Sequence, residues 1–234
     1  VSFTLNDLKQ HLEGLSENTK ISYVQSIVIK RNLNDGDIHA YFIKLKEDND
    51  TQHQGLTDKE IATDFKWEEF KKIYEKMKPN TLNYVIASLY YYLPPLRQGE
   101  YIKMKTVKEK GFNFYSPTLR QFIITESKTK RGYPKRIIDI PTELNDILMS
   151  WISTHKSDYM FGIKLSTSAF TQRLNRIFDK SVSVDLLRKT YISMVVPSMT
   201  ITERKHLAMV MGHALSTQIA SYDKNIGKNT IIKY

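Results

Sequence analysis

The sequence contains no cysteine among its 234 residues, so disulfide bonds, thiolate nucleophiles and cysteine-ligated metal sites are excluded. It also lacks any apolar run close to the roughly 20 residues that a membrane-spanning helix needs. The N-terminal segment VSFTLNDLKQ has neither the basic region nor the apolar core of a secretory signal. We therefore expect a soluble, intracellular protein.

Positive charge is unevenly distributed along the chain. The formal net charge is +10, with 35 Lys and Arg against 25 Asp and Glu. Residues 1–66 contain 8 Lys and Arg against 11 Asp and Glu, which leaves 27 against 14 for residues 67–234. A basic surplus in the C-terminal part alone indicates a polyanionic partner, with nucleic acid first and an anionic membrane surface second. A lysine-rich solvated surface is the alternative.

The first 66 residues predict a small all-α domain. Two helices are indicated at residues 4–32, a third at 38–45, a loop at 47–55 and a short helix at 58–63. Gly14 is suited to end the first helix and Ser16 to cap the second. The second helix would turn Lys20, Lys30 and Arg31 toward solvent.

Residues 67–234 predict a second, larger domain that is mostly helical. Helices are indicated at residues 67–77, 80–93, 142–153, 166–178, 185–195, 202–211 and 216–224. Alternating apolar residues indicate strands at 112–115, 120–125 and 135–140, joined by a Ser-Pro-Thr turn and a basic loop. We therefore expect an α+β fold in which a helical domain carries a small antiparallel sheet.

Five residues in this larger domain have side chains suited to chemistry on a phosphodiester. They are Arg97 in LPPLRQGE, Lys128 in ESKTKRG, Arg188 in VDLLRKT, His213 in MGH and Tyr222 in ASY. Each has an ordinary explanation when taken alone: a surface or ion-paired arginine, a solvated turn lysine, a polar residue after a glycine cap, or a half-buried tyrosine. Their order along the chain is harder to explain in that way.

Together these side chains could make a tyrosine into a nucleophile. A phenol has a pKa near 10, so forming the phenolate at pH 7 costs roughly 4 kcal/mol. Two arginines could bind the non-bridging oxygens of a phosphodiester and stabilise the charge of the transition state. A histidine could add a hydrogen bond, and a lysine on a hairpin could protonate the leaving oxygen. This chemistry needs no metal and no other cofactor.

The order and spacing of the five residues resemble the tyrosine recombinase family of integrases and site-specific recombinases. The resemblance covers about residues 67–234, and the short N-terminal domain is similar to a shortened core-binding domain. The alternative that the chain is a fragment lacking further N-terminal sequence stays open. The resemblance implies that Tyr222 attacks double-stranded DNA to form a 3′-phosphotyrosyl intermediate, with Arg97, Lys128, Arg188 and His213 around the phosphate. It also implies a homotetramer on DNA and no membrane partner.

Two acidic residues leave alternatives open. Asp185 stands three residues before Arg188, where the family usually has histidine, and either accepts the tyrosine proton or caps its helix and fixes Arg188. We favour the cap. Glu100 either holds Arg97 or the adjacent backbone in place, or forms an exposed pair three residues along a helix.

The remaining predictions concern DNA contacts and origin. The basic residues expected to contact DNA are Lys20, Lys30, Arg31, Lys130, Arg131, Lys135 and Arg136. For the hairpin members of this set, a solvated loop is the alternative. The C-terminal tail KNIGKNTIIKY either docks on a neighbouring subunit or is a frayed terminus. A relaxing type IB topoisomerase and a DNA-binding module without turnover are the alternative functions. The LPPLR context looks closer to recombinases of eukaryotic DNA viruses, satellite viruses and mobile elements.

Overall fold

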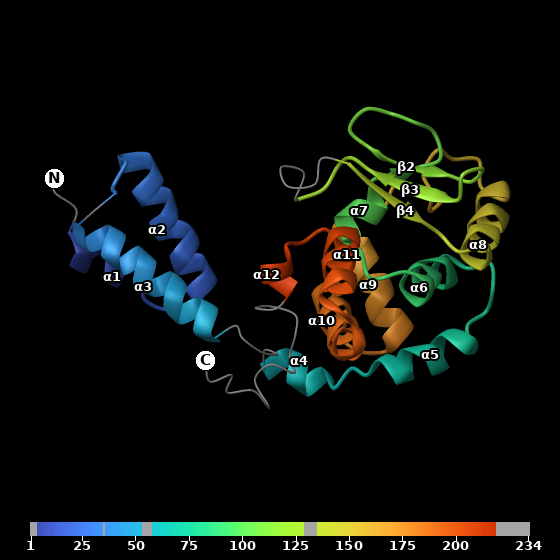
Figure 1. Ribbon diagram of the computed structural model, residues 1–234. Coiled ribbons are helices and arrows are strands. Elements are labelled where there is room, and N and C mark those ends of the chain that lie inside the picture. The colour runs from blue at the N-terminus through green and yellow to red at the C-terminus, as the bar shows by residue number, and fades with distance from the viewer. Residues whose placement is uncertain (1–3, 35, 53–57, 129–134, 219–234) are drawn as a thin grey trace. The chain divides into compact units, whose positions relative to one another are not determined.

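The computed structural model describes residues 4–34, 36–52, 58–128 and 135–218, and the chain forms two compact units (Figure 1). The first unit is Val1–Gly55 and the second is Leu56–Tyr234. The sequence predicts the boundary at residue 66 instead. The short helix α4 (Asp58–Thr63), which the sequence assigns to the N-terminal domain, therefore falls in the second unit.

The N-terminal unit is helical. Its helices are α1 (Leu5–His11), α2 (Glu17–Arg31) and α3 (Gly36–Gln52). They enclose a small core of Leu8, Leu12, Val24, Phe42 and Leu45. The predicted cap is confirmed, because the Ser16 hydroxyl accepts a hydrogen bond from the Thr19 amide at 3.3 Å. The predicted loop at 47–55 is wrong in its first part, since α3 continues to Gln52.

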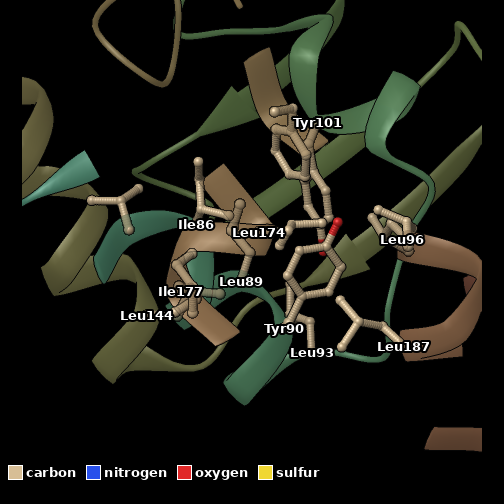
Figure 2. Packing of buried hydrophobic residues seen from close by; sticks show 14 of the residues in the cluster. Ile86, Leu89, Tyr90, Leu93, Leu96, Tyr101, Leu144, Leu174, Ile177 and Leu187 are labelled. Carbon is tan, nitrogen blue, oxygen red and sulfur yellow. The ribbon is translucent and has the colours of Figure 1, made fainter. Parts of the chain in front are cut away.

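The second unit is built around helix α6 (Leu82–Tyr92), which is buried along most of its length. Consecutive residues from Val85 to Tyr90 are buried, so this helix has neighbours on all sides. It packs against α5 (Trp67–Glu75), α8 (Thr142–Ser153) and α9 (Thr167–Phe178). Figure 2 shows Ile86, Leu89 and Tyr90 of α6 among apolar side chains of the same core, including Leu174 and Leu187.

A four-stranded sheet lies at one edge of this unit, and α5 lies at the opposite edge (Figure 1). Its strands are β1 (Met104–Lys105), β2 (Asn113–Ser116), β3 (Gln121–Ile124) and β4 (Arg136–Asp139), in that order. The three predicted strands pair antiparallel, with Phe122 opposite Ile138. The two-residue β1, which is too short to leave a periodic pattern, adds a parallel edge. The predicted α+β class is confirmed, and the sheet is mixed rather than wholly antiparallel.

The C-terminal part returns to helices. It contains α10 (Val184–Val195), a 3-10 turn η1 (Val196–Ser198), α11 (Ile201–Met211) and the short α12 (Leu215–Thr217). A brief helix α7 (Gln98–Ile102), not predicted, follows the Pro94-Pro95 pair. Most of the predicted last helix at 216–224 lies outside the described residues. Among those that are described, no helix is long and apolar enough to cross a bilayer.

Candidate active site

Three arginines converge on the C-terminal end of α11. Arg136 donates from Nη1 to the Val210 carbonyl at 2.5 Å, and Arg188 donates from Nη2 to the Met211 carbonyl at 3.1 Å. Arg97 donates from Nη1 to the Gly212 carbonyl at 2.6 Å. The last carbonyls of a helix have no intrahelical partner and carry the negative end of its dipole, which explains why cations gather there. Three separate segments thereby meet at one helix end.

Gly212 ends α11 and sets the direction of the chain into His213. It adopts the left-handed conformation, with φ 68° and ψ 45°, which glycine takes at little cost. The amide of His213 then donates to the Ala208 carbonyl at 3.0 Å, so the helix end is closed. Gly212 is therefore the C-cap of α11, which is the ordinary explanation that the sequence offers for this Gly-His pair.

Arg97 is the N-cap residue of α7 and is half-buried. The two prolines before it stop α6, and Glu100 accepts a hydrogen bond from the Arg97 amide on Oε2 at 3.3 Å. This contact holds the first turn of α7. It leaves the guanidinium of Arg97 at the wall of a cavity and beside Gly212.

Glu100 is a buried residue with an exposed fraction of 1%. Its Oε1 forms an ion pair with Arg136, and its Oε2 contacts the Arg97 backbone. Burial raises the pKa of the Glu100 carboxyl, and the nearby charges of Arg136, Arg97 and Arg188 oppose that rise. The alternative of an exposed pair along a helix is therefore wrong, because this carboxylate lies inside the cluster of arginines.

Arg188 and His213 form a buried pair. Arg188 is fully buried and donates from Nη1 to the Pro95 carbonyl at 2.7 Å and from Nη2 to Nδ1 of His213 at 2.9 Å. A guanidinium has no acceptor, so Nδ1 accepts, and a neutral ring then carries its proton on Nε2. Burial and the charges of Arg188 and Arg97 lower the pKa of His213 to about 3. The imidazole is therefore neutral at pH 7, with Nε2–H as its donor.

A cavity of about 490 Å³ opens beside this cluster. Its wall includes Arg97, Lys128 and Asp185, three of the residues predicted for the site. They come from the start of α7, from the segment after β3 and from the first turn of α10. The fold thus brings to one opening side chains that lie as much as 88 positions apart in the sequence.

Lys128 is exposed and stands four residues after β3 ends. Asn113, which is buried, fixes the backbone that leads to it. The Asn113 amide oxygen accepts from the backbone N–H groups of Thr125 at 2.9 Å and Glu126 at 2.8 Å, while its Nδ2 donates to the Glu100 carbonyl at 2.9 Å. Sequence reasoning missed Asn113. A polar residue inside the apolar strand FNFY was the available signal.

The basic residues predicted to contact DNA from the hairpin have different positions. Lys130 and Arg131 lie outside the described residues, and Lys135 is exposed directly before β4. Arg136 is buried, with 2% of its side chain exposed in the ion pair with Glu100. The prediction that Arg136 contacts DNA is therefore wrong for this structure, because its guanidinium is bound by Glu100 and by the end of α11. In the N-terminal unit, Lys30 and Arg31 are exposed and Lys20 pairs with Glu17 at 2.6 Å.

Asp185 does not cap α10. The N-cap is Ser183, whose hydroxyl accepts a hydrogen bond from the Leu186 amide at 3.0 Å. Asp185 lies in the first turn with its side chain exposed at the cavity. The favoured cap interpretation is thus wrong, since the serine two positions earlier has the extended backbone and the short hydroxyl that a cap needs.

The nucleophile predicted for this site, Tyr222, lies outside the described residues, which end at Gln218. Within the described ranges, no group of three or more histidine and acidic residues could hold a metal ion. The described cluster itself has three guanidiniums, one carboxylate and a neutral imidazole. It therefore has a surplus of positive charge next to an open cavity and is suited to bind an anion.

Comparison with models of known protein families and with curated proteins gives no match. Comparison with solved structures gives a similar fold in the crystal structure of XerA recombinase, with a TM-score of 0.53 and 15% sequence identity. The match covers 93% of this chain and 82% of that one. At this identity the likeness concerns the fold, and the chain has the fold of a solved recombinase.

Proposed function

We propose that this protein is a tyrosine recombinase that cleaves and rejoins DNA strands through a 3′-phosphotyrosyl intermediate. The observation that carries the proposal is the meeting of Arg97, Arg188 and His213 at the end of α11, beside a cavity that Lys128 and Asp185 also line. Four of these residues, Arg97, Lys128, Arg188 and His213, are among the five that the sequence indicates for phosphodiester chemistry, and Asp185 is the acidic residue for which the sequence leaves two roles open. The fold shared with a recombinase supports the same assignment.

The reaction would begin with attack of the Tyr222 hydroxyl on a phosphorus atom of the DNA backbone. The bond from phosphorus to the 5′ oxygen breaks as the bond to the tyrosine oxygen forms, and Lys128 gives a proton to the departing oxygen. Asp185 would accept the phenol proton, because its exposed carboxylate lies at the same cavity. The phosphodiester energy is kept in the covalent bond, so a second 5′ hydroxyl can reverse the step on the same or another strand.

The arginines and the histidine have separate roles in this proposal. Arg97 would bind the non-bridging phosphate oxygens with its planar fork of donors. His213 would donate from Nε2, since its Nδ1 is held by Arg188. Both Nη atoms of Arg188 already donate to protein acceptors, namely two carbonyls and His213, so we assign it to orienting His213 and to the positive field rather than to direct contact.

Double-stranded DNA is the proposed partner. The basic surplus of residues 67–234 supports this, with Lys135 exposed directly before β4 and Lys30 and Arg31 exposed on α2. Lys130 and Arg131 stay predicted contacts. Strand exchange between two sites would require a homotetramer. We place this activity inside a cell and propose that the protein belongs to a virus, satellite virus or mobile element. Affinity should fall steeply with salt as phosphate-bound counterions are released.

A nicked suicide substrate tests the proposal. The substrate loses a short fragment after cleavage, so the covalent protein-DNA adduct accumulates and survives denaturation. We expect an adduct with the wild type and with the Tyr191→Phe control, which removes a hydroxyl from a partly buried tyrosine of α10. Tyr222→Phe should give no adduct. Adducts that persist in Tyr222→Phe would contradict the assignment of the nucleophile.

A DNA-binding module without turnover is the second candidate. The complete burial of Arg188 favours it, because that guanidinium is occupied by protein groups. This alternative predicts binding to DNA with no adduct from any substrate. If adducts form, joining of two DNA molecules at defined sequences would indicate a recombinase, whereas relaxation of supercoils at any sequence would indicate a topoisomerase.

A further inference from the structure

Arg136 connects three elements of the candidate site. It lies at the first position of β4, forms an ion pair with Glu100 in α7 and donates to the Val210 carbonyl in α11 at 2.5 Å. Glu100 in turn holds the amide of Arg97. One buried guanidinium thus joins the sheet, through Glu100, to the N-cap residue of α7 and, directly, to the helix that precedes His213.

The same guanidinium lies against Gly212. A Cβ atom added to Gly212 would stand 2.9 Å from Cζ and 2.9 Å from Nη1 of Arg136, which is closer than real Cβ contacts. The side chain cannot swing away freely, because both Nη atoms are engaged by Glu100 and Val210. The residue directly before His213 is therefore packed on Arg136 as well as bonded to Arg97.

This arrangement is a costly way to stabilise a fold. Burying an ion pair removes two charges from water, and well-packed apolar residues of similar volume often give equal or greater stability. A lysine would keep the charge, but its single ammonium group lacks the planar fork that reaches two acceptors on different elements. The geometry therefore favours a role in placing groups over a role in stability.

We propose that Arg136 is a positioning residue for the candidate site: by fixing the end of α11 against α7, it sets where His213 and Arg97 stand relative to the phosphate. This inference rests on the proposed function for its consequence in catalysis. It reverses the expectation that Arg136 contacts DNA, and it predicts that changes here slow cleavage without weakening DNA binding.

Arg136→Lys and Arg136→Ala test the inference with three measurements. The first is the single-turnover rate of adduct formation at saturating DNA, the second is the dissociation constant for DNA, and the third is amide hydrogen exchange at Gly212 and His213. We expect a rate about 10- to 100-fold lower, an unchanged dissociation constant, and faster exchange at the two amides. Added ethylguanidinium should restore part of the rate of Arg136→Ala by refilling the vacated space.

Arg120→Ala is the matched control, because Arg120 is an exposed arginine directly before β3, bonded to Thr142. It should alter neither rate nor exchange and should show no response to ethylguanidinium. A wild-type rate and wild-type exchange in Arg136→Lys would overturn the inference, and so would a loss of DNA affinity that accounts for the whole effect. If the wild type forms no adduct, the proposed function fails, and exchange at Gly212 and His213 alone decides the positioning role. Should Arg136→Ala not fold, Arg136→Lys carries the test.

Discussion

Arg188 donates a hydrogen bond to Nδ1 of His213 across 25 positions of sequence, and both side chains are buried. The bond fixes which ring nitrogen can carry a proton. It also places a permanent positive charge beside the imidazole, so protonation of the ring is opposed both by burial and by Arg188. The histidine of this site is therefore a neutral hydrogen-bond donor, and not a cation, at physiological pH.

The stability of the protein should depend on pH through His213. The pKa of this ring is about 3 in the folded state, against 6.5 as the ordinary value. Below pH 6.5 the unfolded chain binds a proton that the folded chain does not, so the free energy of unfolding falls as the pH is lowered toward 3. The slope should approach about 1.4 kcal/mol per pH unit.

His213→Asn isolates that contribution, because its amide oxygen can still accept from Arg188. The raised pKa of Glu100 has the opposite sign, since the folded state then takes up a proton before the unfolded state does and gains stability as the pH falls. Glu100 is present in both the wild type and His213→Asn, so its contribution cancels when denaturant titrations of the two proteins from pH 7 to pH 4 are compared. The free energy of unfolding of the wild type should fall relative to that of His213→Asn as the pH is lowered. A difference between the two proteins that stays constant with pH would contradict a neutral, buried His213 ring.

Gly212→Ala should destabilise the protein and slow cleavage. A non-glycine residue at φ 68° costs about 1 to 2 kcal/mol, and the added methyl group would also press on the guanidinium of Arg136. Thermal denaturation and the adduct assay measure the two effects.

Gly111→Ala is the control for the backbone cost alone. Gly111 has φ 85°, and a Cβ placed there would meet nothing within 4 Å. The Gly111→Ala variant should lose only the free energy that the unfavourable backbone conformation costs, and its cleavage rate should equal that of the wild type. Equal losses of stability and of rate in the two variants would show that the contact between Gly212 and Arg136 has no consequence.

Arg97→Lys should lower the cleavage rate by about 100-fold, the usual loss when one donor to a developing charge is removed. Arg97 is half-buried, and a lysine still has an ammonium group that can donate to the Gly212 carbonyl, so the melting temperature should change little. Single-turnover kinetics beside a melting curve separate the two effects. A rate within twofold of wild type would remove Arg97 from the proposed contact with phosphate.

Asp185→Asn should keep the fold and lower the cleavage rate by about 100-fold, as expected for loss of a proton acceptor. The matched variant Ser183→Ala removes the actual cap of α10 and should cost about 1 kcal/mol of stability. Measuring the unfolding free energy and the rate of adduct formation for both variants separates the proton-acceptor role of Asp185 from the capping role of Ser183. If Asp185→Asn cleaves like the wild type, the base role is wrong.

Most of the helices could be predicted from the sequence because their apolar spacing matches the side that they bury. Helix α8 has the predicted bounds, and α11 begins one residue before its prediction. The loop predicted at 47–55 is wrong in its first part because α3 continues to Gln52 through residues whose composition is typical of a loop. Strand β1 and helix α7 are two and five residues long, which is too short for any periodicity to show.

The candidate site was only partly predictable. Residue types and spacing identified Arg97, Arg188 and His213, but not what binds them. The contacts of Arg136 depend on two elements 36 and 74 positions away along the chain, and residue type alone does not distinguish it from Lys135, its exposed neighbour. Its alternation in β4 was the one available signal, since side chains on successive strand positions face opposite sides.

Peptide mapping of the covalent adduct tests the central claim most directly. Trypsin should release residues 206–224 as one peptide, HLAMVMGHALSTQIASYDK, whose single tyrosine is Tyr222. Mass spectrometry after nuclease treatment should find nucleotide joined to this peptide, with fragmentation placing it on Tyr222 through a 3′ phosphate. Nucleotide on another residue, or a tyrosine joined through a 5′ phosphate, would contradict the account.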